Sequence, residues 1–333
     1  MTTRFDVLTI GNAIVDVIAP IDEKFLIDEG MRKSIMHLIE ADRSADLYAK
    51  MPSEKSIIPG GSSANTAAGV AALGGRAAFV GKVAEDELGL VFRDDFDSKG
   101  ISYETDYLRD GPATARSMIL VTPDGERTMN TYLGACQHLT EADIVEETIQ
   151  SASITYMEGY LWDPAEAKKA FVLAAHYAHK ADRPAAITLS DPFCVNRFRN
   201  EFLDLIKSKT MDYVFANIEE AKALYETDDI NVAVRQLAED AEIAAVTMGS
   251  RGAMAIRNGE IVSVPAFAVD KVVDVTGAGD LFASGFLLAT ARGQSMEEAL
   301  KLGCLAASEV ISHYGARPVA DLKVLARGEG IAV

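Results

Sequence analysis

The segment Asp274-Val-Thr-Gly-Ala-Gly-Asp280 joins a glycine turn to a carboxylate, a combination that could support phosphoryl transfer. The residues after it keep a helical spacing of apolar side chains up to Gly293, so the turn is predicted to lie at a helix N-terminus. The amides of Gly277, Ala278 and Gly279 could bind an anion there, because glycine lets it approach the backbone closely. Asp280, in the first helical turn, could then deprotonate a hydroxyl that attacks a phosphoryl group.

This segment also has an ordinary structural explanation. Asp280 could be only a helix-start residue, and the glycines could form only a tight turn. Short glycine motifs match by chance, so the segment alone does not separate the two interpretations.

Composition bounds the class of protein. The chain has 333 residues of which 49% are hydrophobic, enough to fill one large α/β domain or two smaller ones. A net charge of −18, without clusters of Lys and Arg, argues against partners such as nucleic acids or anionic membranes. Three scattered cysteines predict neither a disulfide framework nor a zinc site. With no signal peptide or membrane span in the sequence, we expect a cytoplasmic protein.

The second half of the chain alternates between strand and helix patterns. Short apolar strands are predicted at 154–157, 185–189, 213–216 and 244–248, with helices at 164–179, 200–207 and 219–225 between them. Such alternation predicts βαβ units in a mostly parallel, three-layer α/β fold.

Polar residues follow the first predicted strand, Phe5 to Ile10. Asn12 and Asp16 lie where that strand should end, and ligands of open parallel sheets bind beyond the carboxyl ends of the strands. An Asx turn and a surface charge are the alternatives. Further on, Gly60 and Gly61 open a helix of small residues and leave amides free at its start, with Asn65 one turn in. A close-packed helix with an ordinary cap would show the same pattern.

Two segments interrupt the α/β pattern. Residues 17–58 have few strand signals, whereas 103–135 are strand-forming, with Pro123-Asp124-Gly125 as a hairpin turn. We predict that both form a small β lid outside the main sheet, within a single α/β domain of residues 1–333. Arg127 could reach a phosphate from this lid, although solvent exposure is the default for such an arginine.

Two later strand ends also carry polar or glycine residues. Asn217 and Glu220 lie one helical turn apart, where they could hold the water shell of a magnesium ion. The loop from Thr247 through Gly249 to Gly252 could run under the phosphates of a nucleotide. Each also has a structural explanation, Glu220 as an acid at a helix start and the glycines as turn residues.

Four motifs, taken together and in this order, resemble the ribokinase-like (carbohydrate and nucleoside kinase, PfkB) family. They are Gly60-Gly61, Asn217-x-x-Glu220, Thr247-x-Gly249 and Asp274-x-x-Gly-Ala-Gly-Asp280. The resemblance covers essentially the whole chain. It implies a ribokinase-like, Rossmann-like α/β fold with a small lid.

The resemblance also implies roles for individual residues. Asp280 would be the base, the amides of residues 277–279 the anion hole, and Arg127 a lid residue over the phosphates. The implied contacts on the acceptor side are Asn12, Asp16, Gly60, Gly61, Asn65 and Leu161. Leu161 marks the place where the family members that act on adenosine have an aromatic residue. The implied contacts on the nucleotide side are Asn217, Glu220, Thr247, Gly249, Gly252, Asp274, Cys304 and Ala307.

Segments such as Ile10-Gly-Asn-Ala-Ile-Val-Asp16 resemble the members that act on adenosine. The implied activity is phosphorylation of the adenosine 5′-hydroxyl by ATP, with Mg²⁺ held by Glu220 through water and with K⁺ as a candidate activator. Alternatives are a sugar kinase of the ribokinase or fructokinase type and an idle nucleoside-binding protein. A nicotinamide dehydrogenase is disfavoured, because no Gly-x-Gly-x-x-Gly follows the first strand. The oligomeric state stays open.

Overall fold

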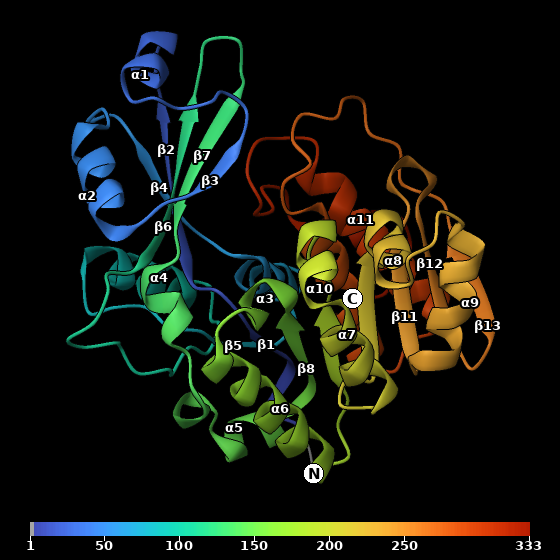
Figure 1. The fold of residues 1–333 in the computed structure, drawn as a ribbon. Helices are drawn as coiled ribbons and strands as arrows, with labels where there is room; N and C mark the ends of the chain where they lie inside the picture. The colour runs from blue at the N-terminus through green and yellow to red at the C-terminus, as the bar shows by residue number, and fades with distance from the viewer. Residues whose placement is uncertain (1–2) are drawn as a thin grey trace.

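The computed structural model describes residues 3–333, which form two β-sheets and the helices packed on them (Figure 1). The central sheet has eight strands. In spatial order these are β13 (Glu260–Val264), β12 (Ala253–Arg257), β11 (Ile243–Thr247), β10 (Tyr213–Asn217), β9 (Ala185–Thr188), β8 (Ala152–Glu158), β1 (Phe5–Ile10) and β5 (Ala77–Val80).

The strands from β11 to β5 are all parallel, as the βαβ pattern predicts. At the other edge, β12 runs antiparallel to both of its neighbours, β11 and β13, and forms a hairpin with β13. The hairpin was not predicted, although its turn, Asn258-Gly259, has positive φ at both residues, which is the geometry of a two-residue hairpin.

Helices cover both faces of the central sheet, because alternate strand residues point to opposite sides. On one face, the apolar sides of five helices share a buried core with the sheet, and these helices are α3 (Ser62–Ala72), α4 (Glu87–Ser98), α10 (Ala278–Ala291), α11 (Met296–Val310) and α12 (Leu322–Gly328). The other face is covered by α5 (Glu146–Gln150), α6 (Ala165–Lys180), α7 (Pro192–Lys207), α8 (Ile218–Leu224) and α9 (Ile230–Asp240). The predicted three layers are therefore confirmed.

Helix α7 begins eight residues earlier than the predicted start at residue 200. Asp191 caps this helix by accepting a hydrogen bond from the amide of Cys194 (2.6 Å), and Pro192 occupies the first turn.

The second sheet, hereafter the lid sheet, projects from one end of the central sheet (Figure 1). Its strands, in spatial order, are β3 (Met36–Leu38), β7 (Arg127–Tyr132), β6 (Ala115–Val121), β2 (Ile14–Pro20) and β4 (Ser56–Gly60). The helices α1 (Glu23–Asp28) and α2 (Ala41–Lys50) lie on its outer side, where Val17, Leu26, Leu47 and Met118 form a small core.

The lid sheet differs from the prediction in two ways. It is mixed, because β2 pairs with β6, and β3 with β7, in parallel, while the β6–β7 hairpin is antiparallel as expected. Residues 103–114 do not join it and contain no strand. They run beside the segment that begins with β5, where Ser102 bridges Ala78 in β5 and Leu108 bridges Ala84 after it. Tyr103 explains this placement, since its ring packs in an aromatic cluster with Phe79, Phe92 and Phe96 in the main core.

Small residues let α3 and α10 approach each other closely. A Cβ on Gly69 would lie 2.4 Å from the Ser284 hydroxyl and 2.7 Å from Leu281. The N-termini of these two helices carry most of the predicted acceptor and base residues, so this contact holds those residues together. Within residues 3–333, no helix is long and apolar enough to cross a membrane.

Candidate active site

Asp280 lies in the first turn of α10, and two side chains from α3 hold its carboxylate. The Ser62 hydroxyl donates to Oδ1 (2.6 Å) and the Asn65 amide donates to Oδ2 (2.9 Å). Burial raises the pKa of Asp280 to about 6, although both hydrogen bonds and the charge of Arg317 work in the opposite direction. The carboxylate is therefore oriented and poised to take a proton near neutral pH.

The glycine turn before Asp280 has the predicted geometry with one difference. Gly277 has φ +80°, a left-handed conformation that favours glycine, and a Cβ at Gly279 would meet only open space. The Ala278 amide is already occupied, because it donates to the Val275 carbonyl (3.2 Å). Among residues 3–333, the amides of Gly277 and Gly279 have no acceptor, so two of the three predicted donors are available.

Asp16 lies on β2 of the lid sheet, opposite Ile58 on one side and Ser117 on the other. Burial raises its pKa to about 7, offset in part by the charges of Arg317 and Arg127. Gly60 makes room for this carboxylate, because a Cβ there would lie 2.7 Å from Asp16 Oδ2.

Asn12 and Gly61 meet at the junction of the central sheet and α3. Gly61 has φ +100°, and a Cβ there would lie 2.1 Å from the Asn12 carbonyl oxygen. The Asn12 amides, backbone and side chain, both donate to Glu158 Oε1 (2.8 and 2.6 Å), and the Ser63 amide donates to Oε2 (2.7 Å). Burial nevertheless raises the pKa of Glu158 to about 7. This buried carboxylate fixes the first strand end to the start of α3.

Arg127, at the start of β7, connects the lid sheet to the glycine turn. Its Nη1 donates to Asp274 Oδ2 (2.8 Å), and the guanidinium lies over the Tyr314 ring. Burial opposes the ionised form of Asp274, but hydrogen bonds from Thr276 and Gly315 and the Arg127 charge lower its pKa. Figure 1 shows the loops before α10 (orange) and after α11 (red) extending toward the lid sheet. Asp274 thus holds Arg127 near the predicted anion site.

A cavity of about 540 Å³ lies on the other side of the turn, within the size range of small-molecule sites. Its lining includes five of the residues predicted to contact the nucleotide, together with Ala278 and Gly279, so the cavity opens onto the glycine turn. The five are Thr247, Gly249, Gly252, Cys304 and Ala307.

Asn217 and Glu220 form a capping box at the start of α8. Both amide groups of Asn217 donate to the Glu220 carboxylate (2.9 and 2.6 Å), and the Glu220 amide donates back to Asn217 Oδ1 (2.9 Å). Burial raises the pKa of Glu220 to about 7. Both carboxylate oxygens are engaged, and residues 3–333 contain no group of three or more acidic, His or Cys side chains that could hold a metal ion. The described part of the chain therefore offers no cage of side chains for Mg²⁺.

Leu161 lies apart from the other predicted acceptor contacts. Its side chain is 1% exposed and packs in the core under α6, so direct contact with a ligand stays a prediction. The neighbouring Tyr160 is 46% exposed, and its hydroxyl donates to the Ser190 carbonyl (3.2 Å). Tyr160 is the aromatic ring that this turn presents to solvent.

Three residues of the site were not predicted. Glu158 ends a buried strand, so the rule that placed Asn12 at a strand end could have found it. Ser62 could have been found by its position in the turn that opens α3. Arg317, whose Nε donates to Asn65 Oδ1 (2.8 Å), lies in a loop with no periodic pattern, and only the fold brings it here.

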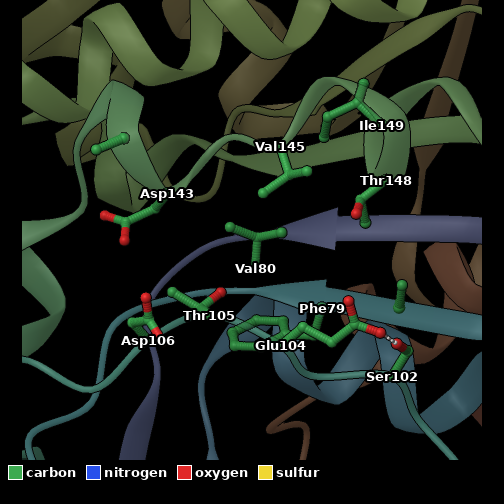
Figure 2. A pocket seen from close by; sticks show the side chains of 12 residues that line it. Phe79, Val80, Ser102, Glu104, Thr105, Asp106, Asp143, Val145, Thr148 and Ile149 are labelled. Carbon is green, nitrogen blue, oxygen red and sulfur yellow. Dashed lines mark hydrogen bonds between the residues drawn. The ribbon is translucent and has the colours of Figure 1, made fainter.

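A second cavity, of about 80 Å³, contains none of the predicted site residues in its lining (Figure 2). Figure 2 shows Asp143 and Val145 on one side and Glu104 and Thr105 on the other. Asp143 already pairs with Lys82 and caps a short turn at Thr140. Its charge therefore has a structural role.

Comparison with known proteins shows the family of this chain. The model of the pfkB family carbohydrate kinases matches residues 33–322. The chain belongs to this family. It is therefore a kinase that transfers a phosphoryl group from ATP to a hydroxyl group, and both the predicted family and the predicted fold are confirmed.

Two solved structures are similar over nearly the full length. Adenosine kinase from Sinorhizobium meliloti is 52% identical, with a TM-score of 0.89 and coverage of 98% of this chain and 99% of that chain. A probable sugar kinase from Rhizobium etli CFN 42 is 50% identical, with a TM-score of 0.91 and coverage of 99% and 100%. Adenosine kinase 2 of Arabidopsis thaliana is 25% identical over 92% of this chain and 94% of that protein.

Proposed function

We propose that this kinase transfers the γ-phosphoryl group of ATP to the 5′-hydroxyl of adenosine and forms AMP, with Asp280 as the general base. The observation that carries the proposal is the Asp280 carboxylate itself. It is held by Ser62 and Asn65, between the lid sheet and the nucleotide-sized cavity, and beside two amides that have no acceptor among residues 3–333.

The chemistry follows from this arrangement. Phosphoryl transfer depends mainly on in-line positioning and on stabilising charge on the transferred group. Asp280 accepts the proton of the attacking hydroxyl, while the amides of Gly277 and Gly279 and the N-terminus of α10 stabilise the phosphoryl oxygens. A base with a pKa of about 6 is mostly ionised at neutral pH and can still accept a proton during the reaction.

On the acceptor side, we assign Asp16, Asn12, Gly61 and Asn65 to the ribose hydroxyls. Gly60 leaves space for the Asp16 carboxylate, and Glu158 orients the Asn12 amide. Adenosine is favoured as acceptor because a relative named adenosine kinase is 52% identical along nearly the whole chain.

A sugar is the second candidate acceptor. The probable sugar kinase from Rhizobium etli is almost as similar, and the groups assigned to the ribose would suit the hydroxyls of a free sugar equally well.

On the donor side, we assign the cavity lined by Thr247, Gly249, Gly252, Cys304 and Ala307 to ATP. Arg127 would leave Asp274 to contact the phosphates. Magnesium would be held by the ATP phosphates and water, because residues 3–333 contain no cluster of side chains that could hold it, and Glu220 would act only at a distance. Activation by K⁺ stays a prediction.

We further propose that residues 1–333 work as one kinase domain whose lid sheet closes over the acceptor. Closure would exclude water and so suppress ATP hydrolysis. The Arg127–Asp274 ion pair supports this proposal, because it already joins the lid sheet to the glycine turn.

The test is a comparison of acceptors. The purified protein is given Mg-ATP with adenosine, guanosine, inosine, ribose or fructose, and kcat/KM is measured from ADP formation. We expect adenosine to exceed every other acceptor by at least about 10²-fold, since a site built for hydrogen bonds rejects ligands that leave its polar groups unpaired. A preference for ribose or fructose would replace adenosine by a sugar, and no turnover with any acceptor would favour a nucleoside-binding protein.

A further inference from the structure

Arg317 lies behind the site, between α3 and α4, and contacts residues of both helices. Its Nε donates to Asn65 Oδ1 (2.8 Å), and its Nη1 lies 3.6 Å from Asp95 Oδ2 on α4. The guanidinium carbon lies 5.6 Å from the centre of the Phe96 ring. A chain of contacts therefore runs from Asp95 through Arg317 and Asn65 to the carboxylate of Asp280.

The burial of this arginine destabilises the fold. Its side chain is 14% exposed, and neither Nη1 nor Nη2 has a hydrogen-bond partner among residues 3–333. Burial lowers the pKa of Arg317, although the charges of Asp95, Asp16 and Asp280 oppose that change. A buried and incompletely paired charge destabilises a protein more than an apolar side chain of similar size would. Arg317 therefore contributes to the site and not to the stability of the fold.

The contact with Asn65 has a definite effect. The Nε–H of arginine can only donate, so the Asn65 atom that faces it must be the oxygen. The amide nitrogen then faces Asp280, whose ionised carboxylate can only accept. Without Arg317, the Asn65 oxygen loses this donor, and the Asp280 carboxylate alone would select the orientation of the amide.

We propose that Arg317 is a positioning residue of the phosphotransfer site: it fixes the orientation of the Asn65 amide that donates to Asp280, and it places a positive charge one side chain away from that carboxylate. Arg317 acts through Asn65 and through its charge, without touching the reacting groups. The kinetic part of the inference rests on the proposed function, in which Asp280 is the base, whereas the structural part does not.

The charged and titratable groups around Asp280 are mostly acidic. Glu158 and Tyr156 on β8, and Tyr160 just after β8, each have their pKa raised in part by Asp280. Arg317 is the positive group whose charge lowers the pKa of Asp280, against the larger effect of burial.

Arg317 in turn faces acids on three elements. They are Asp95 on α4, Asp16 on β2 and Asp280 on α10, and each favours the charged form of the arginine. Removing this one cation should therefore raise the pKa of Asp280, because the neighbouring acids and the burial remain.

The test that does not depend on activity is a titration of Asp280 by carbon-13 NMR of labelled aspartate carboxyl groups, with Asp280→Asn used to assign its signal. We expect Arg317→Met and Arg317→Gln to shift the titration of Asp280 upward by about one pH unit. Arg317→Lys, which keeps the charge, should shift it much less.

The matched control is Arg93→Met. Arg93 lies on α4 and, like Arg317, has a buried guanidinium nitrogen with no hydrogen-bond partner among residues 3–333, in this case Nε. It stacks on Tyr107 and donates to the Thr105 carbonyl, away from Asp280. If Asp280 titrates at the same pH in the Arg317 variants as in Arg93→Met, Arg317 has only a structural role and the proposal is overturned. Either Arg317→Met or Arg317→Gln suffices, provided that it melts cooperatively.

The second readout is the pH profile of kcat/KM. A rise of about one pKa unit from about 6 lowers the ionised fraction of Asp280 about fivefold at pH 6 and hardly at all at pH 9. We therefore expect a loss in Arg317→Met that shrinks as the pH rises, and a loss of equal size at every pH would contradict the proposal. If the wild-type protein phosphorylates no acceptor, the proposed function fails, while the NMR titration still decides the role of Arg317.

Discussion

Replacing Asp280 by Asn changes the proposed base with little change in shape. The amide still fits between Ser62 and Asn65, but it cannot accept a proton in the reaction. Its NH₂ group also faces one of these two hydrogen-bond donors, at a position where the carboxylate oxygen accepted a hydrogen bond. A general base typically contributes about 10²–10⁴-fold, so we expect kcat to fall by that factor. The wild-type profile should also lose its acid limb in the variant.

The magnitude of the acid limb follows from the pKa of about 6. About nine-tenths of Asp280 is ionised at pH 7 and about one-tenth at pH 5, so kcat/KM should fall about tenfold between them.

The same shift affects stability, and its sign can be worked out. The pKa is raised from 3.8 to about 6 in the folded protein, so the protonated form stabilises the fold fully below pH 3.8, and this contribution is lost as the pH rises through 6. The lost contribution is about 3 kcal/mol in the free energy of unfolding. Asp280→Asn should therefore be at least as stable as wild type at pH 8, and unfolding would not explain its inactivity.

The assay is ADP formation with saturating Mg-ATP and adenosine from pH 5 to pH 9, together with a thermal melt of each variant. The matched control is Asp270→Asn, because Asp270 is an exposed acid in the loop before the glycine turn and should leave both profiles unchanged. The account is refuted if Asp280→Asn keeps more than about one-tenth of wild-type kcat, or keeps the acid limb.

Three further substitutions test other parts of the site. Gly61→Ala places a Cβ 2.1 Å from a backbone carbonyl oxygen at φ +100°, so backbone strain alone should lower the free energy of unfolding by about 1–3 kcal/mol. The control is Gly30→Ala, which also has positive φ but open space around it, and it should lower the free energy of unfolding less in a denaturant melt. Arg127→Ala should lower kcat and raise the KM for ATP more than Asp274→Asn does, because only the former removes the guanidinium; equal effects would mean that the ion pair alone matters. Cys304→Leu should fill part of the nucleotide cavity and raise the KM for ATP about tenfold while kcat/KM for the acceptor at saturating ATP stays constant, and the opposite pattern would assign the cavity to the acceptor.

Local patterns predicted much of the fold, because they reflect local physics. The strand at Phe5–Ile10 and the helix that begins at Ala278 follow from apolar periodicity and from a glycine turn. The pairing of β2 with β6 in parallel could not be predicted in this way, since the apolar pattern of a strand does not say in which direction its neighbour runs. Tyr103 was assigned to the lid because the apolar character of a side chain does not say which of two cores it joins.

The candidate site shows the same division. Asp280 could be found because it lies next to the glycine turn in sequence. The partners that set its pKa could not, because Ser62, Asn65 and Arg317 come from segments far apart in the chain and meet only when α3 packs on α10. A pattern of residue types likewise did not show that the Ala278 amide would donate its hydrogen bond to the Val275 carbonyl.

The central claim is that Asp280 drives transfer to the adenosine 5′-hydroxyl, and the most direct measurement is the identity of the product. Wild type and Asp280→Asn are incubated with Mg-ATP and adenosine, and the nucleotides are quantified by mass spectrometry, with phosphorus NMR to locate the new ester and 5′-deoxyadenosine as a second acceptor. The account predicts AMP with its phosphate on the 5′-oxygen, equimolar with ADP, from wild type only, and no product from 5′-deoxyadenosine. ADP without AMP, a phosphate on another hydroxyl, or AMP from Asp280→Asn at the wild-type rate would contradict it.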